Sequence, residues 1–510
     1  MNMAAIWHAA GGALAYPTPA GKLKVVLKAA RGDLKAAHVR FGDRYRGAEG
    51  ERQTALVRVG SDGQHDYWSA TLHLPDRRFR YAFLLDDGRE QVWYGEGGFR
   101  PDPPSPQAGD WWFHYPYLHD LDSAAAPAWV EEAVVYQIFV DRFAQGAFAA
   151  DRSGLPPWGA PVAWDTVAGG DLAGVTDRLD YLAGLGVTCL YLTPVFLAPS
   201  NHKYDTLDYY RIDPAFGDRD SARRLVAECH ARGMRVLFDG VFNHCGWGFA
   251  PFQDVVRHGP RSRYAAWFKV ESYPVRRQPR PTYETFGDRL ADLPKLDTGH
   301  PEVQEYLLKV AEHWTRDLAL DGWRLDVANE VHPDFWRELR RRLRSINPEV
   351  FLAGEVTHPA GPWLGGDQFD SVTNYPFRAA CVDFFARGAV TAEEFAARLT
   401  NLRFRYPDHV GRALLNLLGS HDTERFLTLC GEDRRRLALA AFFQFTSPGV
   451  PYLYYGDEVG MVGGGDPDCR RCMVWDEARQ DRNLRAHFAA LARLRRESRV
   501  LRHGDFAFLE

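Results

Sequence analysis

The spacing of apolar residues along the chain changes near residue 130. Before that point, residues 23–28 alternate apolar and polar side chains, residues 79–85 form a second strand-like run, and Gly, Pro and Asp separate such runs. After it, short fully apolar runs alternate with segments in which apolar residues recur every three or four positions. The first pattern predicts antiparallel strands. The second predicts a parallel sheet that helices cover on both faces.

The short, mostly apolar runs of the second region predict seven strands. They are residues 134–140, 187–192, 235–238, 322–325, 351–353, 413–418 and 451–455. Between them, residues 220–232 predict a helix that begins with a capping Asp and ends at Gly233, and residues 301–318 predict a long amphipathic helix. Seven or eight strand–helix units in one stretch favour a closed (β/α)₈ barrel over an open doubly wound sheet.

These patterns divide the 510 residues into domains. Residues 1–125 are expected to form an N-terminal β-sandwich and residues 126–500 an α/β barrel. The alternation lapses over about residues 243–300, a loop-rich stretch that contains Trp247, Trp267, Tyr283 and Phe286. An insertion of that length after a strand predicts a functional subdomain.

Composition excludes several classes of function. A net charge of -5 gives no reason to expect nucleic acid or an anionic membrane as partner, so a neutral substrate is expected. No apolar run reaches the roughly eighteen residues of a membrane span, and the first residues do not resemble a signal peptide. The 7 cysteines are scattered, which fits a reducing, cytoplasmic location, and Cys469 and Cys472 are interpreted as loop residues.

Carboxylates follow four of the predicted strands. Asp239, Asp326 and Glu355 end three apolar runs, and Asp422 closes a fourth segment. Basic side chains lie next to them in the sequence: Arg324, His244 and His421. Barrel enzymes build their sites at the carboxyl ends of different strands, so we expect these groups to converge. One such Asp alone would be interpreted as a helix cap or ion-pair partner. Four beside Arg and His indicate catalysis, and the lack of two His at i, i+4 disfavours a metal site.

Four segments around these residues resemble the signature regions of the α-amylase superfamily, glycoside hydrolase family 13. They are residues 239–244 (DGVFNH), 322–330 (GWRLDVANE), 354–355 (GE) and 417–422 (LLGSHD). Residues 327–330 (VANE) and 293–297 (LPKLD) resemble the cyclomaltodextrinase, neopullulanase and maltogenic amylase subgroup, and residues 202–206 and 456–460 also match the superfamily. The resemblance covers the whole chain. It implies retaining hydrolysis of α-1,4-glucosidic bonds in cyclodextrins, maltooligosaccharides, pullulan or starch.

The resemblance also implies residue roles. Asp326 would be the nucleophile, Glu355 the general acid/base and Asp422 the stabiliser of the distorted sugar. Seven further residues would bind substrate: Tyr204, Asp239, His244, Arg324, His421, Asp466 and Arg470. Of these, Tyr204 would stack under the sugar at the cut, and Asp466 and Arg470 would contact the next glucose units. Arg324 lies two positions before Asp326 and is expected to favour its ionised form.

The chain departs from the family pattern at three places. Relatives often carry Trp two residues after the acid/base, where this chain has Thr357, which leaves its preference for branched or cyclic substrates open. Residues 144–151 lack most of the oxygen ligands that calcium requires, and Asp151 and Asp171 alone would make a poor site, so no metal or cofactor is predicted. The family normally continues into a C-terminal β-sandwich, and residues 501–510 are interpreted as its start.

The N-terminal domain resembles the carbohydrate-binding-module-like domain of the same subgroup. In those enzymes this domain packs beside the partner's barrel in a dimer and narrows the cleft, so the resemblance implies a homodimer that acts on an α-glucan. Two alternatives stay open. A glucan transferase shares the covalent intermediate but passes it to a sugar, and an amylase-like binding protein without catalysis would lack the three carboxylates that this chain retains.

Overall fold

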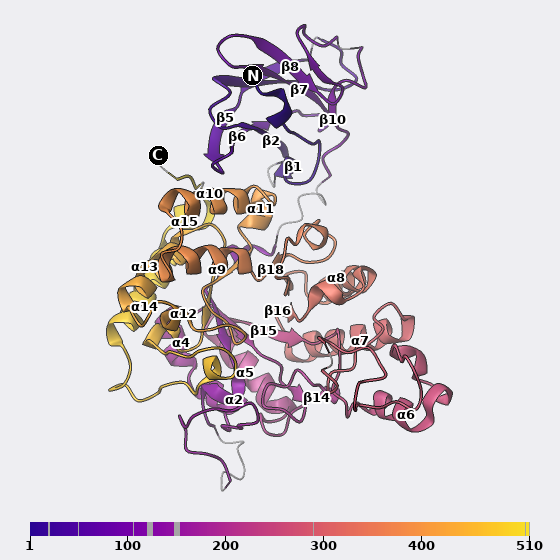
Figure 1. The fold of residues 1–510 in the computed structure, drawn as a ribbon, viewed down its shortest axis with the longest axis vertical. Coiled ribbons are helices and arrows are strands. Elements are labelled where there is room, and N and C mark those ends of the chain that lie inside the picture. The colour runs from indigo at the N-terminus through magenta and orange to yellow at the C-terminus, as the bar shows by residue number, and fades with distance from the viewer. Residues whose placement is uncertain are drawn as a thin grey trace.

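The computed structural model describes residues 1–18, 21–48, 50–105, 107–119, 126–146, 154–288, 290–504 and 506–508. It consists of an N-terminal domain of antiparallel strands that sits on the helices of a parallel barrel (Figure 1). Within the described ranges, no helix combines the length and the apolar character needed to cross a membrane.

The N-terminal domain is the predicted β-sandwich. Its strands are β1 (Ala15–Thr18), β2 (Lys22–Ala30), β3 (Ala36–Gly42), β4 (Arg52–Ala55), β5 (Val57–Ser61), β6 (His65–Leu72), β7 (Phe79–Asp86), β8 (Gln91–Gly95), β9 (Gly98–Arg100) and β10 (Phe113–Tyr115). One sheet has the order β1-β2-β6-β5, and the other has the order β4-β3-β7-β8-β9 with β10 paired to β7. Alternating residues such as Val25 and Leu27 of β2 and Phe83 of β7 share one core between the two sheets.

The barrel consists of eight parallel strands. They are β11 (Val135–Ile138), β12 (Cys189–Leu192), β15 (Arg235–Gly240), β16 (Gly322–Leu325), β17 (Phe351–Gly354), β18 (Ser371–Val372), β19 (Leu415–Leu417) and β20 (Val450–Tyr454). Their order is β18-β17-β16-β15-β12-β11-β20-β19, and a parallel bridge between Thr373 and Leu415 joins the two edges. All seven predicted strands are therefore present. The eighth, β18, was missed because only two of its residues pair.

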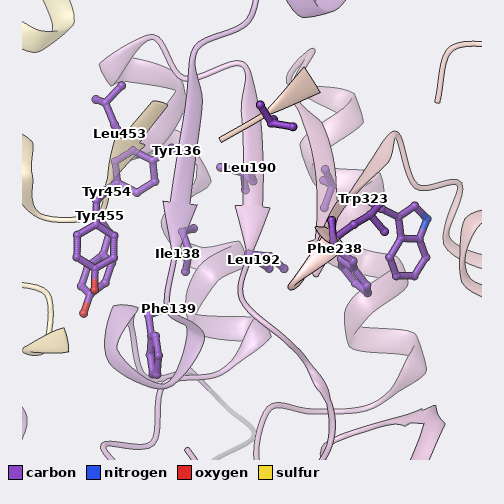
Figure 2. Packing of buried hydrophobic residues seen from close by; sticks show 14 of the residues in the cluster. Tyr136, Ile138, Phe139, Leu190, Leu192, Phe238, Trp323, Leu453, Tyr454 and Tyr455 are labelled. Carbon is purple, nitrogen blue, oxygen red and sulfur yellow. The ribbon is translucent and has the colours of Figure 1, made fainter. Parts of the chain in front are cut away.

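Side chains alternate between the inside and the outside of the barrel. Tyr136 and Ile138 of β11 belong to the large core that packs under the surrounding helices (Figure 2). Val135 belongs to a separate interior cluster. β12 divides in the same way, with Leu190 outside and Tyr191 inside. This alternation explains the fully apolar runs, because both faces of each strand are buried.

Helices surround the barrel. They are α1 (Ala128–Glu131), α2 (Val140–Phe143), α3 (Leu172–Asp177), α4 (Leu179–Leu185), α5 (Arg219–Ala231), α6 (Ala250–His258), α7 (Pro301–Leu318), α8 (Pro333–Ile346), α9 (Tyr375–Cys381), α10 (Ala392–Arg403), α11 (Asp408–Gly411), α12 (Phe426–Leu429), α13 (Arg434–Thr446), α14 (Arg482–Glu497) and α15 (Arg499–His503). A short antiparallel pair, β13 (Phe196–Leu197) and β14 (Asp208–Ile212), follows β12.

The structure bears on the predicted cap of one helix and on the C-terminal segment. The cap of α5 is Asp218, not the predicted Asp220, because Asp218 has extended backbone and accepts a bond from Ser221 N at 2.8 Å. At the end of the chain, residues up to His503 are helical and residues 505, 509 and 510 lie outside the described part. The C-terminal β domain expected from residue 501 therefore stays a prediction.

The N-terminal domain contacts the barrel through α10, α11 and the loop between them (Figure 1). The ring of Tyr67 in β6 stacks on Phe404 with centroids 4.3 Å apart, and Lys24 forms an ion pair with Asp408. Val26 completes the small apolar cluster around Phe404. This apolar contact stabilises the attachment more than the exposed ion pair between Arg31 and Glu393 does.

The stretch predicted as an insertion follows β15 and contains α6 and several isolated bridges. The bridge between His244 and Lys295 attaches it to the end of the strand, and a second bridge pairs Val270 with Tyr283. Trp267 and Tyr283 are buried in the barrel core, so these two aromatic residues serve packing. Phe286 instead reaches the cleft described below.

Candidate active site

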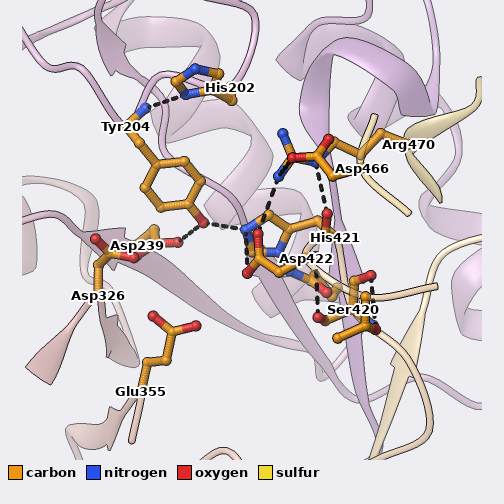
Figure 3. A network of polar contacts seen from close by, with 12 residues as sticks. His202, Tyr204, Asp239, Asp326, Glu355, Ser420, His421, Asp422, Asp466 and Arg470 are labelled. Carbon is orange, nitrogen blue, oxygen red and sulfur yellow. Dashed lines mark hydrogen bonds and ion pairs between the residues drawn. The ribbon is translucent and has the colours of Figure 1, made fainter. Parts of the chain in front are cut away.

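Three carboxylates lie at the carboxyl ends of neighbouring barrel strands. Asp239 belongs to β15, Asp326 directly follows β16, and Glu355 directly follows β17. The three strands are adjacent and parallel, so their carboxyl ends meet at one mouth of the barrel. Asp422 joins them from the loop after β19, which ends at Leu417 (Figure 3). The predicted convergence of four acids at the barrel mouth is therefore what the structure shows.

The buried guanidinium of Arg324 contacts three of these carboxylates. Its Nη1 lies 2.7 Å from Asp326 Oδ1 and 2.9 Å from Asp239 Oδ1, and its Nη2 lies 2.6 Å from Glu355 Oε1. Asp239 also accepts bonds from the hydroxyls of Tyr191 at 2.5 Å and Tyr204 at 2.9 Å. Arg324 therefore fixes the positions of Asp326 and Glu355 relative to each other, with Asp239 anchored beneath.

The burial of Asp326 changes its titration. Burial raises the pKa of Asp326 well above its usual range, although the Arg324 guanidinium acts in the opposite direction. Burial likewise raises the pKa of Asp239. The expectation that Arg324 alone would decide the ionisation of Asp326 omitted this desolvation. The neighbouring carboxylates of Glu355 and Asp239 raise the pKa of Asp326 further.

The second oxygen of Asp326 is buried and has no hydrogen-bond partner among the described residues. A buried carboxylate oxygen without a donor is costly and is uncommon away from functional sites. The same carboxylate is oriented through Oδ1 by Arg324, so Oδ2 remains available to a substrate in the cleft.

A second polar cluster lies around Asp422 (Figure 3). Arg470 Nη2 contacts Asp422 Oδ1 at 3.1 Å and Asp466 Oδ2 at 2.8 Å. His421 Nε2 lies 3.2 Å from Asp422 Oδ2 and 2.7 Å from the hydroxyl of Tyr204. Because Tyr204 also contacts Asp239, this tyrosine links the Asp422 side of the site to the Arg324 side.

These groups surround a cavity of about 730 Å³. Eight of the ten predicted site residues line it: Tyr204, His244, Asp326, Glu355, His421, Asp422, Asp466 and Arg470. The remaining two, Asp239 and Arg324, do not line it and lie buried beneath its floor. Their predicted role as substrate-binding residues is therefore better described as support of Tyr204 and of the two carboxylates that flank the cavity.

His244 lines the cavity beside the insertion. Its ring stacks on Phe286 with centroids 4.8 Å apart, and burial lowers its pKa to about 3, so the ring is neutral. Its Nε2 is buried without a hydrogen-bond partner in the described part of the chain. A neutral imidazole nitrogen in that position can bind a sugar hydroxyl.

Sequence reasoning did not single out several residues that line or support the cavity. Tyr375 donates to Glu355 Oε1 at 3.2 Å, and Trp164 lines the cavity while remaining 63% exposed. The carbonyl of Trp164 is held by the buried amide of Asn201 at 2.8 Å. Nothing in the local sequence marks Tyr375 or Trp164. Gln137 contacts His421 and could have been found, since it is polar within an otherwise apolar strand.

No group of three or more His, Cys, Asp and Glu side chains in the described ranges has the arrangement of a metal site. The loop predicted to have lost its calcium ligands falls largely on residues 147–153, including Asp151, which lie outside the described residues. Asp171, the other candidate ligand, caps α3 by accepting a bond from Gly174 N at 2.7 Å.

Comparison with known proteins identifies the family. Residues 137–499 match the model of the alpha amylase catalytic domain, and residues 1–119 match that of the alpha amylase N-terminal ig-like domain. The chain is 48% identical to a cyclomaltodextrinase of Geobacillus thermopakistaniensis over 100% of its own length and 87% of the relative's. It is 40% identical to an intracellular maltogenic amylase of Bacillus subtilis, with 98% and 85% covered.

A solved structure of a cyclomaltodextrinase is similar over 100% of this chain and 87% of that one, with a TM-score of 0.96 and 44% identity. The family models cover most of both domains, and the relatives align along the whole chain. The chain therefore belongs to the α-amylase family of glycoside hydrolases.

Proposed function

We propose that this protein hydrolyses α-1,4-glucosidic bonds with retention of configuration, through a covalent glycosyl-enzyme intermediate. The observation that carries the proposal is the pair formed by Asp326 and Glu355, which share one guanidinium and face the same cavity. Close carboxyl groups are what a retaining enzyme needs, since one attacks the sugar while the other exchanges a proton with the leaving oxygen.

In the first step, Asp326 Oδ2 attacks the anomeric carbon. Glu355 gives its proton to the glycosidic oxygen as the bond from that oxygen to the anomeric carbon breaks. In the second step, Glu355 takes a proton from water, and the resulting hydroxide displaces Asp326. Two inversions at the same carbon give net retention. The bonds from Arg324 and Tyr375 hold Glu355 in place for both proton transfers.

Substrate binding is expected to use the remaining side chains of the cavity. We infer that Asp422 and His421 bind the hydroxyls of the sugar at the cut, and that Tyr204 lies under its ring. Asp466 and Arg470 would contact the next glucose units, with Trp164 as an apolar surface beyond them. Cyclodextrins, maltooligosaccharides, pullulan and starch are the candidate substrates, and the relatives named above, a cyclomaltodextrinase and a maltogenic amylase, support this class.

Product analysis tests the function. Incubation with γ-cyclodextrin, maltotriose, pullulan and starch should release reducing sugars that initially have the α configuration, as seen by proton NMR. Adding excess glucose as acceptor distinguishes hydrolysis from transfer, because a transferase would form longer or rearranged glucosides in place of free products. No turnover of any of these substrates would favour the alternative of a binding protein without catalysis.

We further propose that no calcium ion is required. The early loop offers few oxygen ligands, and Asp171 is already used as a helix cap. Treatment with EDTA is therefore expected to leave both kcat and the melting temperature within experimental error. A melting temperature that falls by many degrees and recovers with added calcium would contradict this prediction.

A homodimer in the cytoplasm is the proposed working form. All 7 cysteines are free and buried, which fits a reducing compartment, and one relative is named intracellular. In the N-terminal domain, Asp66, Tyr67 and Trp68 are buried, whereas Tyr45 is 70% exposed between Arg44 and Arg78. Tyr45 is therefore the better candidate for contact with a second copy.

Two variants test the dimer. We expect that the full chain sediments at twice its 57.8 kDa and prefers γ-cyclodextrin to amylopectin in kcat/KM. Removing residues 1 to about 120 should give a monomer with reduced preference, but it also exposes Phe404. Tyr45→Ala leaves Phe404 covered, and it should also give a monomer with a reduced preference for γ-cyclodextrin. Trp7→Ala is its control, because Trp7 is exposed to a similar extent in the same domain.

A full-length chain that sediments as a monomer and prefers starch would refute the dimer and its effect on specificity. A dimer that both Tyr45→Ala and Trp7→Ala leave unchanged would instead place the interface elsewhere on the molecule.

A further inference from the structure

Gln137 is a fully buried amide in β11, next to Tyr136 and Ile138. The alternation along this strand directs it into the barrel, and its Nε2 lies 2.6 Å from Nδ1 of His421. Its Oε1 is buried without a hydrogen-bond partner in the described part of the chain. Leaving a buried amide oxygen unpaired is costly. We interpret the hydrogen bond from Gln137 to His421 as the reason for an amide at this buried position.

The contacts of His421 fix which ring nitrogen carries the hydrogen. Nε2 lies 2.7 Å from the hydroxyl of Tyr204, whose single hydrogen is donated to Asp239 Oδ2, so Nε2 must donate to the hydroxyl oxygen. Burial lowers the pKa of His421 well below its usual value, so the ring is neutral and Nδ1 carries no hydrogen. Nδ1 is then an acceptor, and Gln137 must present its amide N–H to it. The contacts at Nδ1 and at Nε2 therefore both require the tautomer of His421 that carries its hydrogen on Nε2.

This tautomer sets the direction of the bonds along the floor of the cleft. With hydrogen on Nε2, His421 donates to the hydroxyl oxygen of Tyr204 at 2.7 Å, and Tyr204 donates to Asp239 Oδ2 at 2.9 Å. In the reverse tautomer, Nε2 would be an acceptor that faces the Tyr204 hydroxyl. Tyr204 would then have to donate to His421, and Asp239 beneath Arg324 would lose a donor.

We propose that Gln137 is a positioning residue that holds His421 in the Nε2–H tautomer and so keeps its one donor directed at the hydroxyl of Tyr204. The inference rests on the proposed hydrolase function, since Tyr204 is the residue proposed to lie under the sugar at the cut. Gln137 itself does not line the cavity, so it acts only through His421.

The sharpest test replaces the donor by an acceptor. In Gln137→Glu, the new carboxylate at Nδ1 raises the pKa of His421, because it stabilises the imidazolium. The charged groups and titratable rings that already act on His421 are Asp422, Tyr204, Arg470, Arg324, Glu355 and His202. Below the raised pKa both ring nitrogens donate and activity persists. Above it, the remaining hydrogen stays on Nδ1 and Nε2 stops donating.

We therefore expect the basic limb of the kcat–pH profile of Gln137→Glu to lie about one pH unit or more below that of the wild type. Gln137→Met keeps the length of the side chain but removes the donor. It should lower kcat on the order of tenfold while KM changes little, because a buried acceptor is left unpaired near the reacting sugar.

Gln444 offers a matched control. It is a buried amide of α13 that donates to the carbonyls of Asn416 at 2.7 Å and Tyr452 at 2.9 Å. Gln444→Met and Gln444→Glu should lower the melting temperature without shifting the pH profile. This result would separate the loss of a buried hydrogen bond from an effect through His421.

A readout without turnover distinguishes failure of this inference from failure of the proposed function. In protein with ¹⁵N-labelled histidine, the His421 signals are identified by their loss in His421→Asn. The wild type should show an unprotonated, acceptor-type Nδ1, and Gln137→Glu should show a protonated one. If the wild type hydrolyses no α-glucan, the function fails while this test still stands. A Gln137→Met variant with wild-type kcat, pH profile and tautomer overturns the inference, even if Gln137→Glu does not fold.

Discussion

Asp326→Asn is expected to lower kcat by roughly 10⁴- to 10⁶-fold, the range seen when one member of a nucleophilic catalytic set is removed. The amide that replaces the carboxylate has the same shape, and its oxygen can still accept from Arg324 as Oδ1 does now at 2.7 Å. It cannot form a stable ester with the sugar. Since burial disfavours the charged form of Asp326, the melting temperature should stay the same or rise.

The measurement is kcat on maltotriose together with thermal unfolding of the same preparation. Asp370→Asn is the matched control, because Asp370 is a buried carboxylate of the barrel that Arg340 and Arg344 contact at 2.7 and 2.8 Å, away from the cavity. That variant should lose stability but keep most of its kcat. An Asp326→Asn variant with a kcat close to that of the wild type would refute the nucleophile assignment.

The sequence predicted the barrel because each strand is local and is buried on both faces. Runs such as residues 322–325 contain only residues that are buried in the fold, so their pattern needs no knowledge of the neighbouring strands. The positions of Asp326 and Glu355 follow directly, since each comes immediately after its strand. β18 was missed because it pairs through Ser371 and Val372 alone, and its place is decided by the strands beside it.

Features of the site that depend on long-range contacts were not predictable in the same way. Tyr375 reaches Glu355 from the start of α9, and Trp164 reaches the cavity from a loop held by Asn201. The raised pKa of Asp326 arises from burial by the whole domain, which an adjacent Arg in the sequence cannot reveal. Residue types at strand ends thus indicate the chemistry, whereas protonation and the shape of the cleft require the fold.

Glu355 is the proposed proton donor. Glu355→Gln should lower the turnover of maltotriose by about 10²- to 10⁴-fold, because the leaving sugar can no longer be protonated. Formation of the glycosyl-enzyme from α-maltosyl fluoride should be much less affected, since fluoride departs without a proton. The second step still lacks a base, so the intermediate should accumulate, and azide, which needs no deprotonation, should release it as maltosyl azide.

The fluoride released in the first turnover measures the glycosylation step, and mass spectrometry of the trapped protein shows the intermediate. Glu355 forms an ion pair with Arg324 Nη2 at 2.6 Å. It accepts hydrogen bonds from the hydroxyl of Tyr375 and the backbone N–H of Val327, both at 3.2 Å. A Gln side chain can keep the contact with Arg324 through its oxygen, but its amino group cannot accept from Val327.

Tyr375→Phe is therefore the control, because it disturbs the position of Glu355 while keeping the proton. It should lower turnover of maltotriose and glycosylation by maltosyl fluoride far more evenly than Glu355→Gln does. If Glu355→Gln itself slows glycosylation by both substrates to the same extent, Glu355 is not the acid that protonates the leaving group.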